Sequence, residues 1–160
     1  MTIQTGERLP EVTFMTITAD GPAPVTTSEV FAGRTVALFA VPGAFTPTCS
    51  AKHLPGFVTQ IDALKAKGID RIACTSVNDM FVMDAWAKDQ GAGDSVTMLA
   101  DGNGQFAEEL GLVMDGTAFG MGKRSQRYAM VVKDGVVEHL FVEEPGGFEV
   151  SSAEHMLAHL

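Results

Sequence analysis

Cysteine, tryptophan and tyrosine are scarce in this sequence: 160 residues include two cysteines, one tryptophan and one tyrosine. Two cysteines are too few for the disulfide framework of a small secreted domain, so we expect both to be thiols in a reducing compartment. No apolar run approaches the roughly 20 residues that cross a bilayer, and the first residues lack the basic start and apolar core of a signal peptide. These absences predict a cytoplasmic protein.

Positive charge is also in the minority. The chain carries 11 Lys and Arg against 20 Asp and Glu, a formal net charge of -9. Such a balance repels phosphate backbones and anionic lipid surfaces, so we expect neither a nucleic-acid nor a membrane partner. Hydrophobic residues make up 46% of the chain and charged residues 19%, which suits a packed core. The length suits a single domain, which we place over residues 1–160.

Short apolar runs alternate with stretches that have helical character. Strands are predicted at residues 12–18, 36–41, 69–77 and 96–100, and a final hairpin at residues 128–132 and 136–142. Helices are predicted at residues 47–67, with a kink at Pro55, at 79–90, at about 105–110, and from Ser151 or Ser152 to the end. Residues 111–122 are predicted to form a glycine-rich loop. This order indicates an α/β fold with a mixed central sheet flanked by helices.

Cys49 lies where a buried strand passes through a short loop into a helix. If Pro47 takes the first helical position, Thr46 is the N-cap and Cys49 lies in the first turn. The unpaired N–H groups and the helix dipole at that end favour an anion, hence the thiolate, which is the reactive form of cysteine. The alternative interpretation is that Cys49 is a small buried hydrophobe, as many free cysteines are.

Two motifs resolve this choice through a resemblance. The spacing Pro42-x-x-x-Thr46-x-x-Cys49 resembles the active-site signature of the peroxiredoxins, and VPGAFTPTCS followed by HLPGF is similar to their type II, peroxiredoxin 5-like branch. Far downstream, KRSQRYAMVV resembles the family segment that carries the active-site arginine, which falls at Arg127. The resemblance runs from about Pro10 to Leu160. It implies a thioredoxin-like fold with an N-terminal β-hairpin addition.

The resemblance also implies a peroxidase for hydrogen peroxide and alkyl hydroperoxides that needs neither metal nor haem. Cys49 would attack the peroxide and become a sulfenic acid. Thr46 would hydrogen-bond the peroxide and the sulfur, Arg127 would stabilise the developing charge, and Pro42 would shape the pocket. A dithiol–disulfide oxidoreductase is disfavoured, because Thr46 stands where C-x-x-C chemistry needs a cysteine. A cysteine hydrolase is also disfavoured, because the sequence shows no recognisable Cys–His–Asn pattern. A redox-sensor or holdase role stays open as an addition.

Four other features complete the predictions. Cys74 lies well inside its predicted strand, too far from Cys49 for a disulfide without local unfolding, so we expect a core thiol. Residues 145–160 contain no cysteine, which leaves a one-cysteine cycle with an external reductant: glutathione with glutaredoxin first, thioredoxin second. His53 is expected to be a packed or capping residue, and Arg124 to be a surface or loop-fixing residue.

Aromatic residues at loop tips favour association between copies of this chain. The residues are Phe45, Phe81 and Phe119. Clustered together, they would form an apolar patch that suits an interface better than solvent. Because the type II branch often pairs through loops around the active site, the resemblance implies a two-fold homodimer.

Overall fold

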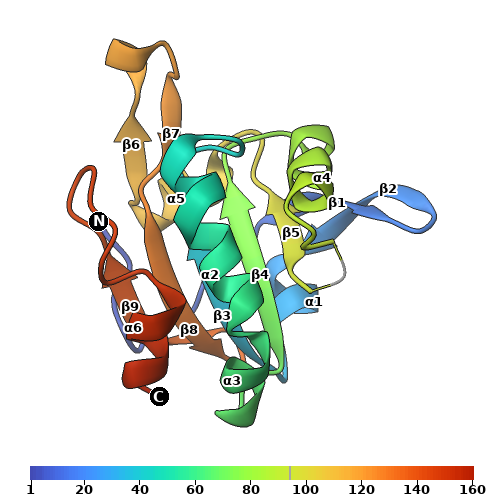
Figure 1. The fold of residues 1–160 in the computed structure, drawn as a ribbon, viewed down its shortest axis with the longest axis vertical. Coiled ribbons are helices and arrows are strands. Elements are labelled where there is room, and N and C mark those ends of the chain that lie inside the picture. The colour runs from blue at the N-terminus through green and yellow to red at the C-terminus, as the bar shows by residue number, and fades with distance from the viewer. Residues whose placement is uncertain (94) are drawn as a thin grey trace.

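The computed structural model describes residues 1–93 and 95–160. Its centre is a seven-stranded sheet in the order β2-β1-β5-β4-β3-β8-β9 (Figure 1). The strands are β1 (Thr13–Thr18), β2 (Gly21–Thr26), β3 (Thr35–Ala40), β4 (Arg71–Ser76), β5 (Thr97–Ala100), β8 (Tyr128–Lys133) and β9 (Val136–Val142). Strands β3, β4 and β5 pair in parallel, and the other pairs are antiparallel. The sheet is therefore mixed, with β1 and β2 as an N-terminal hairpin (Figure 1).

Helices cover both faces of this sheet. They are α1 (Thr27–Phe31), the π-helical turn η1 (Cys49–His53), α2 (Leu54–Thr59), α3 (Ile61–Ala66), α4 (Met80–Asp89), α5 (Gln105–Leu110) and α6 (Ala153–Ala158). Residues of α2, α3, α4 and α6 join one apolar cluster, while residues of α1 and α5 join the other. No helix among the described residues is both long and apolar enough to cross a membrane.

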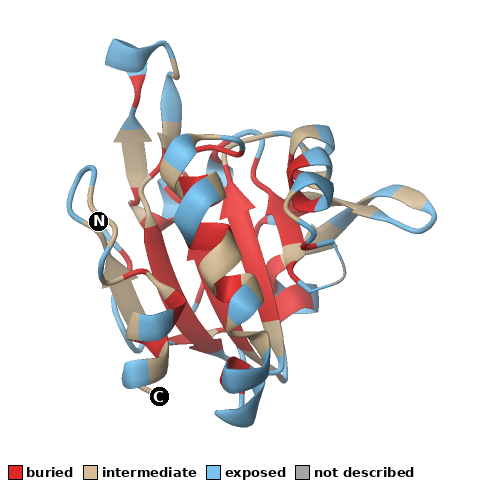
Figure 2. Cartoon of the chain, in the orientation of Figure 1, coloured by how far each residue is buried: buried red, intermediate tan, exposed pale blue. Residues whose placement is uncertain are grey.

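The two clusters meet at β3, whose side chains alternate between the faces. Ala37 and Phe39 belong to the cluster beneath α2, whereas Val36, Leu38 and Ala40 belong to the opposite one. All five are fully buried (Figure 2). This explains why residues 36–41 form a continuous apolar run, since a strand covered on both faces needs apolar residues at every position. Full burial of each large side chain contributes about 1.5–3 kcal/mol, so this strand holds the sheet firmly beneath the loop that follows it.

The predicted helix over residues 47–67 is divided in the structure. Helical hydrogen bonding starts at Pro47, widens into η1, returns to α geometry in α2 and breaks at Gln60 before α3. Pro55 lies at the start of α2, where its ring cannot fit against the carbonyl four residues back. A π turn, in which the N–H bonds five residues back, precedes the proline: Leu54 N–H donates to the Cys49 carbonyl.

The prediction of a loop at residues 111–122 was wrong in part. Strands β6 (Val113–Asp115) and β7 (Lys123–Ser125) pair as a separate two-stranded sheet, with the 3₁₀ turn η2 (Thr117–Phe119) between them. Strands of three residues are too short to show an alternating pattern, and the glycines around them are typical of a loop. Helix α1 was also missed, although Thr26 and Glu29 form a capping box at its start.

Candidate active site

Strand pairing brings the two predicted motifs together at one edge of the sheet. Strands β3 and β8 are antiparallel, with Ala40 opposite Tyr128. The cysteine loop leaves β3 just after Ala40, and Arg127 comes just before Tyr128, so both lie at the same edge. On the other side of β8, Val142 is opposite Tyr128, and the backbone N–H of Glu143 donates to the Arg127 carbonyl at 3.0 Å. Three segments distant in sequence therefore converge there.

The loop between β3 and Cys49 is held by a neighbouring strand end. The Asn78 side-chain oxygen accepts from the Ala44 N–H at 2.9 Å and from the Ser76 hydroxyl at 2.7 Å. Ser50 N–H then donates to the Thr46 carbonyl at 3.0 Å, the first bond of the helix. Thr46 is thus the last residue before the helix, and Cys49 lies in its first turn, as the sequence predicts.

The sulfur of Cys49 has two polar neighbours. Its Sγ lies 2.8 Å from the Thr46 hydroxyl and 3.0 Å from Nη2 of Arg127, and the residue is fully buried. The Thr46 hydroxyl is also 2.7 Å from the Gly43 carbonyl, but it has one hydrogen to donate. The Gly43 carbonyl and the Cys49 sulfur are therefore alternative acceptors for this one hydrogen. A thiolate would be the stronger acceptor of the two, because it is charged and the carbonyl is neutral. A guanidinium and a hydroxyl are thus both within hydrogen-bond distance of one buried sulfur, and each can donate to it.

His53 connects the guanidinium to the C-terminal part of the chain. Its Nδ1 is 2.8 Å from Nη1 of Arg127, and its Nε2 is 2.9 Å from the Ser151 carbonyl. Burial, and then the charge of Arg127, lowers the pKa of His53 from 6.5 to about 3. The ring is therefore neutral near pH 7. A carbonyl can only accept, so Nε2 donates to Ser151, which leaves Nδ1 to accept from Arg127.

The contact between His53 and Arg127 was not predicted. The sequence supports a packed histidine, and the ring does pack against Phe39 and Phe148 at centroid distances of 4.8 and 5.1 Å. The Phe148 ring also lies 5.9 Å from the Arg127 guanidinium carbon, within the range of a cation–π contact. Spacing along the chain gives no signal for either partner, because Arg127 and His53 are separated by 74 residues.

An open cleft of about 840 Å³ is lined by both side chains that contact the sulfur, Thr46 and Arg127. Pro42, Thr46 and Arg127 are among its lining residues. The rest of the lining is mainly apolar and glycine-rich, with three carboxylates: Pro47, Thr48, Val113, Met114, Asp115, Phe119, Met121, Gln126, Glu143, Glu144, Pro145, Gly146 and Gly147. Of the four residues predicted for the site, three thus line the cleft, and the fourth, Cys49, is buried beside Thr46 and Arg127.

Among the described residues, neither Arg124 nor Cys74 forms a hydrogen bond with the Cys49 sulfur, although the Arg124 guanidinium lies beside Gly43 of the cysteine loop. Arg124 donates to the Met121 and Val77 carbonyls at 2.9 and 3.4 Å, which makes it a loop-fixing residue. Cys74 is fully buried in β4, opposite Phe39 of β3, and neither cysteine is in a disulfide. Burial raises the pKa of the Cys74 thiol well above its ordinary value, so Cys74 is a poor nucleophile.

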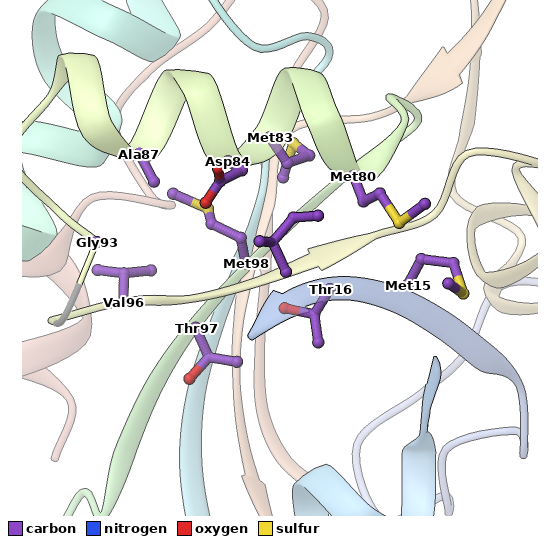
Figure 3. Close-up of a pocket in the computed structure, with 11 residues that line it drawn as sticks. Met15, Thr16, Met80, Met83, Asp84, Ala87, Gly93, Val96, Thr97 and Met98 are labelled. Carbon is purple, nitrogen blue, oxygen red and sulfur yellow. The ribbon is translucent and has the colours of Figure 1, made fainter. Parts of the chain in front are cut away.

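A second, smaller hollow lies between α4, β1 and β5 (Figure 3). It measures about 190 Å³, and four methionines contribute to its lining: Met15, Met80, Met83 and Met98. Asp84 adds a carboxylate to a set of otherwise uncharged side chains. Within residues 1–93 and 95–160, no group of three or more His, Cys, Asp or Glu side chains is arranged to hold a metal ion.

Comparison with known proteins agrees with this geometry. The Redoxin family model matches residues 4–157. Chloroplastic peroxiredoxin-2E of Arabidopsis thaliana is 52% identical, over 97% of this chain and 68% of that protein. The chain belongs to the peroxiredoxin family. The hybrid peroxiredoxin hyPrx5 of Haemophilus influenzae is 47% identical, over 100% of this chain and 67% of that protein.

Solved structures of peroxiredoxins also match the fold of this chain. Reduced Prx3 of Vibrio vulnificus, in complex with hydrogen peroxide, is 53% identical, covers 99% of each chain and superimposes with a TM-score of 0.95. The predicted thioredoxin-like fold and the assignment to the type II, peroxiredoxin 5-like branch are both confirmed. As a peroxiredoxin, the protein is a thiol-dependent peroxidase.

Replacing Arg127 by Gln should slow the reaction with hydrogen peroxide by about 100-fold, the usual cost of removing a donor from a developing negative charge. Arg124→Gln is the matched control, because it removes the same charge from a side chain that donates to the Met121 and Val77 carbonyls and not to the sulfur. We expect that variant to stay within about fivefold of the wild type. Competition with horseradish peroxidase for limiting peroxide measures both rates. Equal losses in the two variants would show that Arg127 has no special role.

The buried, neutral His53 predicts a dependence of stability on pH. Below pH 6.5 the unfolded chain binds a proton at this residue, whereas the folded chain does not until about pH 3. Stability is therefore lost as the pH falls from 6.5 toward 3, by up to about 1.4 kcal/mol per pH unit. Between pH 6.5 and 5.0, urea unfolding of the wild type should lose about 1–2 kcal/mol more than that of His53→Asn. Parallel losses in the two proteins would contradict a neutral His53.

Proposed function

We propose that Cys49 is the nucleophile that reduces hydrogen peroxide and alkyl hydroperoxides in a one-cysteine cycle. One observation carries this proposal: the Cys49 sulfur is 3.0 Å from the Arg127 guanidinium and 2.8 Å from the Thr46 hydroxyl, and both of these side chains line the 840 Å³ cleft. Cys74 has no comparable donors. Among the described residues, its thiol has one hydrogen bond, to the Thr75 carbonyl at 4.0 Å.

In the first step, the Cys49 thiolate attacks the terminal oxygen of the hydroperoxide. A sulfur–oxygen bond forms, the O–O bond breaks, and the cysteine becomes a sulfenic acid while the other oxygen leaves as an alkoxide or hydroxide. Arg127 stabilises this leaving oxygen, which takes a proton from solvent. Thr46 directs its hydroxyl toward the sulfur and the peroxide. Pro42, which is half-buried at the cleft wall, limits the access of water to the sulfur.

The lining of the cleft supports organic as well as inorganic peroxide. Hydrogen peroxide is little larger than water, and a cleft of about 840 Å³ is far larger than this substrate needs. Val113, Met114, Phe119 and Met121 present apolar side chains to the same space. An alkyl group attached to the peroxide can pack against them and gain binding energy from its buried surface.

The second half of the cycle needs an external thiol. A first thiol attacks the sulfenic sulfur, forming a mixed disulfide and water, and a second thiol releases the Cys49 thiol as a new disulfide leaves. Glutathione with glutaredoxin is our first choice of reductant, since a tripeptide fits the dimensions of the cleft, and thioredoxin is the second. Cys74 is fully buried within β4, which argues against an internal resolving role.

Cys49→Ser should abolish peroxide turnover, because a serine hydroxyl is hardly ionised near neutral pH. Cys74→Ser should retain most of it. Turnover is followed as NADPH consumption, with glutathione, glutaredoxin and glutathione reductase in one assay, and thioredoxin and its reductase in another. A folded Cys74→Ser protein without activity would overturn the one-cysteine cycle. Turnover in the thioredoxin assay alone would reverse our order of reductants.

We also propose that the protein forms a two-fold homodimer through the loops around this site. Three exposed aromatic side chains support this: Phe45 is 52% exposed, Phe81 62% and Phe119 82%. The prediction that all three lie at loop tips was wrong for Phe81, which lies in the first turn of α4. A solvated monomer would leave all three rings in water, at a cost that burial in an interface removes. Phe45 has a left-handed backbone with a φ of 64°, a conformation that costs a non-glycine residue energy. A partner against this loop would help to hold it.

The reduced protein should sediment as a dimer at micromolar concentration. Phe119→Asp should shift it toward monomer, because a charge in an apolar interface is costly to bury. Analytical ultracentrifugation of both proteins measures the change. A wild-type monomer with full peroxidase activity would contradict the dimer and leave the catalytic assignment unaffected.

A further inference from the structure

Glu143 holds together the segment that follows β9, part of which lines the active-site cleft. One of its carboxylate oxygens, Oε2, accepts from the Glu149 N–H at 2.7 Å and from the N–H and hydroxyl of Ser151 at 2.8 and 2.7 Å. These bonds join the end of β9 to residues six and eight positions later. Through its own N–H, Glu143 is also tied to the Arg127 carbonyl. A single residue thus fixes the segment on one side and the strand of Arg127 on the other.

The position of Ser151 determines how His53 meets Arg127. The Ser151 carbonyl accepts from Nε2 of His53, and this selects the tautomer whose Nδ1 has a free lone pair. Without that carbonyl, the ring could place its hydrogen on Nδ1 and direct it at the guanidinium, where two donors would oppose each other. The carbonyl therefore acts on Arg127 through two hydrogen bonds, one on each side of the imidazole.

The carboxylate form of Glu143 suits this arrangement. Burial acts to raise its pKa, but the hydrogen bonds from Ser151 and Glu149 and the charge of Arg127 outweigh burial, and the pKa is lowered. An ionised carboxylate is the acceptor that three converging donors require, because charge-assisted hydrogen bonds are stronger than neutral ones.

We propose that Glu143 is a positioning residue for peroxide reduction: it fixes the Ser151 carbonyl, which sets the tautomer of His53, which in turn orients Arg127 on the Cys49 sulfur. The inference rests on the proposed roles of Cys49 and Arg127. It adds that the geometry of the guanidinium depends on a carboxylate which touches neither the sulfur nor the guanidinium.

The test compares three variants by competition for limiting hydrogen peroxide. Glu143→Ala leaves the three donors without an acceptor and should slow peroxide attack by about tenfold, the scale of a small displacement of a catalytic group. Glu143→Gln can place its amide oxygen where Oε2 lies, and should recover most of that loss. Glu138→Ala is the matched control: it removes the same charge from an exposed position on β9, the strand that ends just before Glu143, and should stay within about twofold.

A double-mutant cycle separates positioning from general destabilisation. In a His53→Asn background the proposed link is already broken, so adding Glu143→Ala should cost no further rate. Glu143→Gln, alone and in the same background, gives the comparison if the alanine variant fails to fold. Full activity in a folded Glu143→Ala protein, or independent multiplicative losses in the double variant, would overturn the proposal. Activity in Cys49→Ser would instead overturn the assignment of the nucleophile.

Discussion

The contact between the Arg127 guanidinium and the Cys49 sulfur is the interaction on which the rest of the site depends. It joins residues 78 positions apart in the chain and brings a cation to a fully buried sulfur. A partly buried guanidinium needs partners for several N–H groups, and the fold supplies the sulfur to Nη2 and the neutral His53 ring to Nη1. Phe148 adds a ring 5.9 Å from the guanidinium carbon.

Sheet register makes this contact possible. Ala40 is opposite Tyr128, and Tyr128 is opposite Val142. The start of the cysteine loop, Arg127 and Glu143 therefore lie at the same edge of the sheet. A slip of one residue between β3 and β8 would turn the side chains of the shifted strand to the other face. The fully buried residues of β3 resist such a slip, because each face of that strand meets a different apolar cluster. The catalytic geometry therefore depends on packing across the whole sheet.

Interactions between residues close together in the chain could be predicted from the sequence, whereas contacts between distant residues could not. The strand of residues 36–41 and the helix start at Thr46 depend on neighbours along the chain, and both were predicted. The placement of Arg127 followed from a resemblance between motifs. The contact of Asn78 with Ala44 spans 34 residues, and that of His53 with Ser151 spans 98. A lone Asn or His in a sequence does not specify a partner at such distances, so neither contact could be derived. The π turn was hidden because an α-helix and a π turn share the same local composition.

The two halves of the catalytic cycle place opposite demands on the segment that carries Cys49. Attack on peroxide favours a sulfur held away from water by fixed donors, and Cys49 is fully buried. Reduction requires a second sulfur, which is bulkier than a peroxide oxygen, to approach the same buried atom closely. The structure offers a resolution in the helix itself, which is divided into a π turn and two short helices of six residues each. Hydrogen bonding in π turns is less favourable than in α-helices, and short helices are only marginally stable by themselves.

The bond from the Trp86 indole to the Ser50 hydroxyl, at 3.0 Å, and the packing of Leu54 and Phe57 hold the segment in place. A few side-chain contacts therefore hold the first turn of this segment in place. The sequence predicts one helix over these 21 residues with a kink at Pro55, and the structure adds a π turn before Pro55 and a break at Gln60. Such a divided helix suits a nucleophile that is enclosed for one step and accessible for the next.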